Sequence, residues 1–306
     1  MTAGQPEHPV TRRRFDGRVA VVTGASRGIG AALARTLAAE GCAVACAART
    51  EQVWDERLPG TIHETVEAIR RAGGRAVAVR CDLTVEEDIA ALAEAARELG
   101  TVDVLVNNAA LTVPGRPAAG AATARAATGR APADPVGFLD FPLKAYRLHF
   151  AIDVFAAYRL MQLVLPGMVA VGRGSILNIT SDASRRPDEG PWRSAGTTTP
   201  FAYGGAKAAL EHLTRAVAHE VAPQGVAVNA LMPSLPVATP GLRATSADVD
   251  EEMPVADFCE AALRVLTASP GRTTGQILYS HDILHPELGR RGWLGNTDRK
   301  DTPWPR

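Results

Sequence analysis

The stretch "RVAVVTGASRGIG", residues 18–30, joins an apolar run to a glycine-rich turn and then to the start of an alanine-rich segment. The apolar run predicts a buried strand over 18–24, and the segment after the turn predicts a helix over 30–41. Three glycines allow a tight turn and close backbone approach: Gly24, Gly28 and Gly30. Because the first amides of such a helix attract phosphate groups, we expect the pyrophosphate of a dinucleotide to bind at this turn.

The order of strand, turn and helix repeats along the chain. This alternation predicts an α/β fold, a single doubly wound Rossmann-like domain whose mostly parallel seven-stranded sheet carries helices on both faces. The expected strands are 18–24, 43–50, 76–82, 102–109, 174–181, 226–233 and 275–280. The expected helices are 30–41, 61–74, 85–100, 144–170, 202–222 and 255–268.

Four stretches do not follow this repeat. We expect a flexible tail at 1–14, a Rossmann-like domain over 15–280 and a C-terminal extension at 281–306. The domain would contain two insertions, 112–137 and 183–200, the first of which is low in complexity and has little to bury.

The composition is that of a soluble globular protein, with 46% hydrophobic and 22% charged residues. Equal numbers of basic and acidic residues, 33 each, give no support for a nucleic-acid partner. No uninterrupted apolar run is long enough to span a membrane, and no secretion signal is recognisable, so we expect a cytoplasmic protein. Neither the four cysteines nor the seven histidines have the spacing of metal ligands, and no metal site is predicted.

The end of the second expected strand reads Ala47-Ala48-Arg49 and contains no carboxylate. An acidic residue there would hold the ribose 2′-hydroxyl of NAD, whereas Arg49 together with Arg27 would bind a 2′-phosphate. The residues therefore favour NADP over NAD. The alternative is that both arginines simply face solvent in an arginine-rich chain.

The segment "YGGAK" places Tyr203 and Lys207 one helical turn apart, on one face of a helix. The chain has only three lysines among its 33 basic residues, which suggests a specific role for Lys207. A phenol has a pKa of about 10, so acid–base work near neutrality requires a decrease of roughly 3 units, or about 4 kcal/mol. One ammonium at about 4 Å supplies about 4 kcal/mol at an effective dielectric constant near 20, so Lys207 alone would suffice.

Several segments occur in the order and spacing of one family: "TGASRGIG" (23–30), "NNAA" (107–110), Ser181, "YGGAK" (203–207) and "VNALMP" (228–233). The chain thereby resembles the short-chain dehydrogenases/reductases over most of 16–280. The segment 60–84 is most similar to the branch of that family that includes hydroxysteroid dehydrogenases. The resemblance implies a nicotinamide cofactor and carbonyl–alcohol chemistry.

The resemblance also implies roles for individual residues. Ser181 would bind the substrate oxygen, Tyr203 would exchange its proton, and Lys207 would hold the nicotinamide ribose and lower the pKa of Tyr203. The expected cofactor-binding residues are Gly24, Ser26, Arg27, Gly28, Ile29, Gly30, Arg49, Asp82, Leu83, Asn108, Ala109, Tyr203 and Lys207. Among these, Asp82 and Leu83 would contact adenine, and Asn108 and Ala109 would line the cofactor.

Three positions depart from the family pattern, the first of which is Ala110 in "NNAA", where glycine is common. Ser234 follows "MP" where glycine is usual, which leaves the roles of that loop open. Asp153 stands where the family usually has an asparagine that supports a proton relay to the lysine. It is either an isosteric exchange or an added carboxylate near Lys207, and in the second case it would raise the pKa of Tyr203. We include Asp153 among the expected catalytic residues with Ser181, Tyr203 and Lys207.

The sequence thus predicts an NADP(H)-dependent oxidoreductase that interconverts a small-molecule ketone and a secondary alcohol, with Tyr203 as acid and base. The alternatives are an enzyme with modified chemistry in a biosynthetic pathway, or an NADP-binding sensor or assembly subunit without catalysis. The resemblance further implies a homodimer or homotetramer formed through the helices at 144–170 and 202–222, although the apolar stripes of these helices fit burial against the sheet equally well. From the lengths of the apolar runs we expect no membrane partner.

Overall fold

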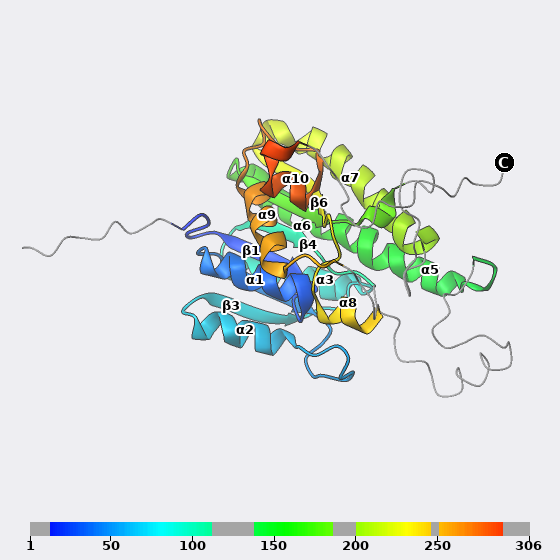
Figure 1. Ribbon diagram of the computed structural model, residues 1–306. Coiled ribbons are helices and arrows are strands. Elements are labelled where there is room, and N and C mark those ends of the chain that lie inside the picture. The colour runs from blue at the N-terminus through cyan, green and yellow to red at the C-terminus, as the bar shows by residue number, and fades with distance from the viewer. Residues whose placement is uncertain (1–12, 112–137, 186–199, 246–250, 290–306) are drawn as a thin grey trace, which may run out of the picture.

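The computed structural model describes residues 13–111, 138–185, 200–245 and 251–289. Seven parallel strands form one sheet in the order β3-β2-β1-β4-β5-β6-β7 (Figure 1). The strands are β1 (Val19–Thr23), β2 (Ala43–Ala48), β3 (Arg75–Arg80), β4 (Val102–Asn107), β5 (Gly174–Ile179), β6 (Val226–Met232) and β7 (Ile277–Tyr279). The strand order reverses between β1 and β4, which is where ligands bind in doubly wound sheets.

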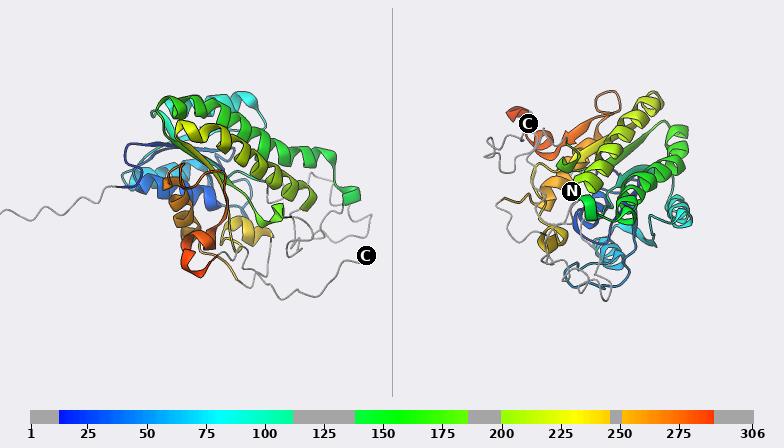
Figure 2. Two further views of the ribbon diagram at one scale, coloured as in Figure 1. Left: turned by 90° about the horizontal axis from the view of Figure 1, so that it is seen from above. Right: turned by 90° about the vertical axis from the view of Figure 1, so that its right-hand side faces the viewer.

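Helices cover both faces of the sheet (Figure 2). One face carries α1 (Gly28–Ala39), α2 (Ile62–Arg71) and α9 (Val255–Thr267). The other carries α3 (Glu86–Arg97), α6 (Ala156–Ala170), which continues from α5 (Leu143–Phe150), and α7 (Gly205–Val221). Two short helices, α8 (Pro240–Thr245) and α10 (Ser280–Leu284), follow β6 and β7.

The central strands are buried on both faces, which explains their continuous apolar sequences. In β1, Ala20 and Val22 pack toward α1 and α9, whereas Val19 and Val21 pack toward α3 and α6. The strand β3 lies at the edge and has exposed arginines at both ends, Arg75 and Arg80. Charged ends of this kind protect an edge strand from pairing with other chains.

The predicted fold class is confirmed, and so are all seven expected strands and six expected helices, with ends that move by a few residues. The short helices α8 and α10 were not predicted. Within the expected extension at 281–306, Ile283 and Leu284 of α10 pack on the core, and residues 290–306 lie outside the described residues. The insertion 112–137 and most of the loop 183–200 lie outside the described residues.

Two expected helices contain a π-helical turn. The helix expected at 144–170 has a π-turn at Ala151–Phe155, and the helix expected at 202–222 starts with a π-turn at Pro200–Gly204. Turns of this type are rare and are frequent at functional sites. Each of these two turns carries a residue of the predicted site, Asp153 and Tyr203.

The continuous helix from Leu143 to Ala170 is long and apolar enough to cross a membrane by length and composition alone, although the sequence had suggested no such segment. Its second half packs on the sheet, because Leu160, Met161 and Val164 belong to the buried core beside α3. Apolar composition is expected of a helix that covers a sheet in this way.

Candidate active site

The glycine turn lies against the end of β4, at the point where the strand order reverses. A Cβ on Gly30 would lie 2.3 Å from the carbonyl oxygen of Gly24 and 2.5 Å from Nδ2 of Asn108, so only glycine is accommodated there. Gly24 and Gly28 have φ of 68° and 56°, the left-handed region that favours glycine. Arg27 at the N-cap of α1 gives no side-chain hydrogen bond to the helix. The turn and the helix start therefore form a cradle that suits a pyrophosphate.

The turn is held to β4 by Thr23, which sequence reasoning did not single out. Its Oγ1 accepts hydrogen bonds from the backbone amides of Asn108 and Ala109, at 3.0 and 3.1 Å. In return, Nδ2 of Asn108 donates to the carbonyl oxygen of Thr23 at 2.9 Å. The position of Thr23 directly before Gly24 is the only signal for it in the sequence.

A buried chain of hydrogen bonds connects β4, β5 and α7. Asn107 donates from Nδ2 to Oδ1 of Asn178 at 2.8 Å, and Asn178 donates from its own Nδ2 to Oγ1 of Thr214 at 2.8 Å. Thr214 then donates to the carbonyl oxygen of Leu210 at 2.8 Å. Because every side-chain link is buried and paired, these hydrogen bonds fix α7 relative to β4 and β5, the strands that lead into Asn108 and Ser181.

Ser181 follows β5, and its Oγ accepts a hydrogen bond from the amide of Ala183 at 3.3 Å. The loop after Ser181 packs against the π-turn that holds Tyr203. A Cβ on Gly204 would lie 2.1 Å from the carbonyl oxygen of Ala183, whereas a Cβ on Gly205 would make only ordinary contacts. The first glycine of "YGGAK" is therefore what allows the serine loop to approach Tyr203.

Lys207 is almost completely buried, with 2% of its side chain exposed. Its Nζ donates to Oδ1 of Asp153 at 2.7 Å and to the carbonyl oxygen of Ile179 at 2.9 Å, and it lies 5.5 Å from the centre of the Tyr203 ring. Burial opposes the charge of Lys207, but Asp153 and Tyr203 outweigh burial and raise the pKa of Lys207 above its ordinary value. Lys207 is thus a fixed cation beside the phenol.

The pKa of Tyr203 corrects our expectation from the sequence. Burial raises it most, Lys207 lowers it, Asp153 raises it further, and a hydrogen bond with Ser181 lowers it; the result is a raised pKa. The sequence argument set the attraction of Lys207 against the ordinary pKa of a phenol and left out the cost of burying a phenolate. The sequence analysis also considered that Asp153 would raise the pKa of Tyr203, and the structure gives the same direction.

His149 also belongs to this cluster, and the sequence analysis assigned it no role there. It is 6% exposed, and its ring packs edge-to-face with that of Tyr203 at 6.1 Å between centroids. Burial, the largest effect, lowers the pKa of His149, while Asp153 raises it and Lys207 lowers it. The sequence offered one signal, the placement of His149 four residues before Asp153 on the same expected helix.

The two arginines expected at the ribose differ in their contacts. Arg27 donates to the backbone carbonyl oxygens of Pro59 and Gly60, at 3.4 and 3.1 Å, and so holds the loop after β2 against the glycine turn. Arg49 is exposed and lies 3.8 Å from Asp82. Arg49 and Asp82 therefore lie together at the ends of β2 and β3, whereas the side chain of Arg27 already holds the backbone of the loop after β2.

Three further predicted residues, Ser26, Ile29 and Leu83, are buried or partly buried. Ser26 is buried in the glycine turn. Ile29 packs on the core beside α1, and Leu83 packs on the core of the opposite face.

Ser234, the departure after "MP", is completely buried. Its amide donates to Oγ of Ser280 at 3.0 Å, and its own Oγ accepts from the amide of His281 at 3.0 Å. A glycine cannot accept this second hydrogen bond. Ser234 thus ties the loop after β6 to the start of α10.

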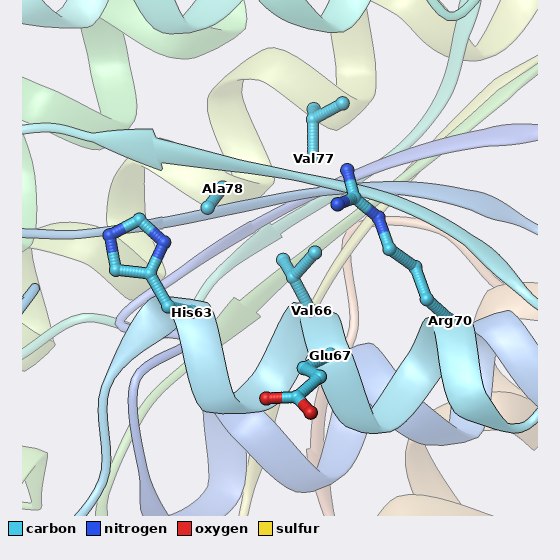
Figure 3. Close-up of a pocket in the computed structure, with 6 residues that line it drawn as sticks. All are labelled: His63, Val66, Glu67, Arg70, Val77 and Ala78. Carbon is cyan, nitrogen blue, oxygen red and sulfur yellow. The ribbon is translucent and has the colours of Figure 1, made fainter.

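The structure also has a shallow hollow outside α2 and β3, lined by His63, Val66, Glu67, Arg70, Val77 and Ala78 (Figure 3). It involves none of the residues described above. In the figure the side chains of His63 and Arg70 lie at its two ends. We assign it no role in the candidate active site.

The parallel sheet, the glycine cradle and the grouping of Ser181 with the buried Tyr203 and Lys207 are the features of a class of dinucleotide-dependent oxidoreductases. The family model of the short-chain dehydrogenases matches residues 18–250. The chain belongs to this family.

Individual relatives agree with this assignment. The 7α-hydroxysteroid dehydrogenase of Escherichia coli K12 is 31% identical over 277 residues, which cover 87% of this chain and 93% of the relative. A solved structure of 7α-hydroxysteroid dehydrogenase with NADH and 7-oxoglycochenodeoxycholic acid is 29% identical, covers 88% of this chain and 94% of that chain, and has a TM-score of 0.68. A metagenomic short-chain oxidoreductase solved with NADP is 27% identical, covers 87% and 97%, and has a TM-score of 0.64.

Proposed function

We propose that this chain is an NADP(H)-dependent oxidoreductase that interconverts a ketone and a secondary alcohol. The observation that carries the proposal is the convergence of three groups: Tyr203 lies beside the buried cation Lys207 and within hydrogen-bonding reach of Ser181. They lie at the carboxyl ends of the strands, beside the glycine cradle. Such a cluster is suited to the proton half of a hydride transfer.

The bound nicotinamide would supply or accept the hydride at the carbonyl carbon. Ser181 would donate a hydrogen bond to the substrate oxygen and hold it near Tyr203. In ketone reduction Tyr203 would give its phenolic proton to that oxygen, and in alcohol oxidation its phenolate would take the proton back. Lys207, fixed by Asp153 and Ile179, would stabilise the phenolate.

Because the pKa of Tyr203 is raised, ketone reduction and alcohol oxidation should depend on pH in opposite ways. Reduction needs the protonated phenol, so its rate stays level through neutral pH and falls only above the raised pKa. Oxidation needs the phenolate, so its rate increases as the pH rises toward that value. The chain's own residues thus favour reduction at neutral pH.

The preference for NADP rests on Arg49 and on the absence of a carboxylate at the end of β2. The guanidinium of Arg49 would bind the 2′-phosphate, with Arg27 beside it. The solved relatives contain either NADH or NADP, so the family alone does not decide between the two.

Tyr203→Phe tests the proposed chemistry. Oxidation of NADPH and of NADH is followed with a panel of ketones that includes a 7-oxo bile acid and alicyclic ketones. We expect turnover with NADPH and a loss of about 10²- to 10⁴-fold in kcat for the variant, with NADPH binding retained. Tight NADPH binding without turnover on any ketone would instead identify a sensor, and an unchanged kcat in Tyr203→Phe would remove Tyr203 from the mechanism.

We also propose that the enzyme is a cytoplasmic homodimer or homotetramer that associates through the helix faces at 143–170 and 200–221. Phe155 and Tyr158 support this, because they are 62% and 49% exposed on that helix surface. Sedimentation velocity gives the test, since a monomer at micromolar concentration contradicts it.

A further inference from the structure

The serine loop, the turn that follows Ser181, consists of Asp182, Ala183, Ser184 and Arg185. Its backbone is closed by a hydrogen bond from the amide of Ser184 to the carbonyl oxygen of Ser181 at 3.0 Å. The amide of Arg185 donates to the carbonyl oxygen of Asp182, also at 3.0 Å. The only apolar side chain of the loop is the methyl group of Ala183, so burial of apolar surface contributes little to holding it. Its position therefore depends on polar contacts with other elements.

The hydroxyl group of Tyr279, at the end of β7, holds two side chains of the serine loop at once. It donates to Oδ1 of Asp182 at 2.7 Å and accepts from Nε of Arg185 at 2.9 Å. The guanidinium of Arg185 also lies over the Tyr279 ring, 5.1 Å from its centre. Burial and the hydrogen bond to Asp182 raise the pKa of Tyr279, so the hydroxyl keeps the proton that it donates. One hydroxyl group thus ties both ends of the serine loop to the sheet.

Glu211 on α7 holds the serine loop from a second side. Its Oε1 accepts a hydrogen bond from Oγ of Ser184 at 2.6 Å, and the residue is only 8% exposed. Burial raises the pKa of Glu211, while Ser184 and Arg185 act in the opposite direction. Glu211 lies one helical turn after Lys207 on the same helix. The loop after Ser181 is therefore tied to the helix that carries the buried cation of the candidate site.

These contacts determine where the hydroxyl group of Ser181 lies. Ser181 begins the turn, and its Oγ accepts from the amide of Ala183, so the hydroxyl moves with the serine loop. The loop follows β5, whereas its two anchors belong to β7 and α7, so three elements together define the position of one oxygen atom. A misplacement of about 1 Å at a reaction centre can cost on the order of 100-fold in rate.

We propose that Tyr279 and Glu211 are positioning residues that hold the Ser181 hydroxyl where it meets the substrate oxygen. The inference rests on the proposed function, in which Ser181 donates a hydrogen bond to that oxygen. Both residues act through the serine loop and not on the reacting atoms themselves.

The first test needs neither cofactor nor substrate. The exchange of the backbone amide hydrogens of Ser184 and Arg185 with water is measured by NMR in the wild type, in Tyr279→Phe and in Glu211→Ala. We expect both amides to exchange about 10-fold faster in each variant, because a loop that has lost an anchor opens more often. The amide of Val21 in the central strand β1 should keep its wild-type exchange, which shows that the fold is intact. Unchanged exchange at Ser184 and Arg185 in both variants overturns the proposal.

The second test is the steady-state rate of ketone reduction. Tyr279→Phe keeps the ring and removes only the hydroxyl, so we expect kcat to fall by about 10- to 100-fold while the Kd for NADPH stays near the wild-type value. Glu211→Gln keeps an oxygen that accepts from Ser184 and should retain most of the kcat that Glu211→Ala loses. A merely structural role would not separate kcat from NADPH binding in this way, nor would it be rescued by the amide.

Two variants outside the candidate site serve as matched controls. Glu220→Ala removes an exposed carboxylate from the same helix as Glu211, and Thr267→Val removes a hydroxyl that binds only the backbone of its own helix. Both should keep the wild-type kcat. A wild-type kcat in Tyr279→Phe, or equal losses in Glu211→Gln and Glu211→Ala, contradicts the proposal. A failure of the proposed function appears separately, as absence of turnover in the wild type, and leaves the exchange measurement valid.

Discussion

At the scale of single residues, Asp153 and Lys207 act on Tyr203 in opposite directions. The carboxylate raises the pKa of the phenol, and the ammonium lowers it. We expect Asp153→Asn to lower the pKa of Tyr203 and to move the pH profile of alcohol oxidation toward lower pH. Initial rates of oxidation between pH 6 and 11 provide the measurement, and thermal unfolding is the control for loss of fold. Superimposable profiles would leave Asp153 as an isosteric replacement for asparagine.

The two glycines of "YGGAK" should differ in their tolerance of a methyl group. Gly204→Ala places a Cβ 2.1 Å from the carbonyl oxygen of Ala183, so the serine loop must move away from Tyr203. We expect a loss of about 1–3 kcal/mol in the free energy of unfolding and a marked loss of kcat. Gly205→Ala is the matched control, because its Cβ meets nothing closer than 3.9 Å. Urea denaturation and steady-state rates distinguish the two variants, and equal behaviour contradicts the steric argument.

At the scale of elements, the chain Asn107–Asn178–Thr214 joins two strands to the helix that carries Lys207. Asn178→Ala leaves both of its neighbours without the partner described above. We expect the free energy of unfolding to fall by about 2–5 kcal/mol, since each unsatisfied buried group costs about 1–3 kcal/mol. Thr214→Val removes only one end of the chain and should cost less. A smaller loss of unfolding free energy in Asn178→Ala than in Thr214→Val would show that these three hydrogen-bonded side chains do not stabilise the fold as a unit.

The elements show where sequence reasoning succeeds. The strands and long helices could be predicted from apolar runs and periodicity. A central strand such as β1 is buried on both faces, so nearly all of its residues are apolar. The π-turns did not follow, since one additional residue in a helical turn leaves the apolar pattern nearly unchanged. The short helix α8 was not predicted either, because six residues are too few to show a helical periodicity.

The same difference applies to the candidate site. Tyr203, Lys207 and Asp153, which the structure brings together, were singled out because they lie in or near motifs with a fixed spacing. The contact of His149 with the ring of Tyr203 depends on how two segments pack after folding, and its spacing from Asp153 alone does not predict that contact. The pKa of Tyr203 was misjudged for the same reason, since burial is a property of the whole packed site.

At the scale of the whole molecule, binding of the cofactor should stabilise the fold according to its affinity. NADPH at about 100 times its Kd adds roughly 2.7 kcal/mol, which corresponds to an increase in Tm of roughly 4 °C for a chain of 306 residues. We expect Arg49→Ala to reduce the shift given by NADPH but not the shift given by NADH. Arg49 is a better position for this test than Arg27, because the side chain of Arg27 also holds the backbone of Gly60. Equal shifts for the two cofactors in the wild type would contradict the NADP preference.

The burial of Lys207 has a practical consequence for chemical labelling. The chain has three lysines, of which Lys144 is exposed on α5 and Lys300 lies outside the described residues. An amine-reactive dye or crosslinker has very few primary amines to attack, and the one at position 207 is shielded and held as a cation. Surface coupling through amines should therefore leave the reaction centre untouched, and any dye recovered on the peptide that contains Lys207 would report opening of the fold.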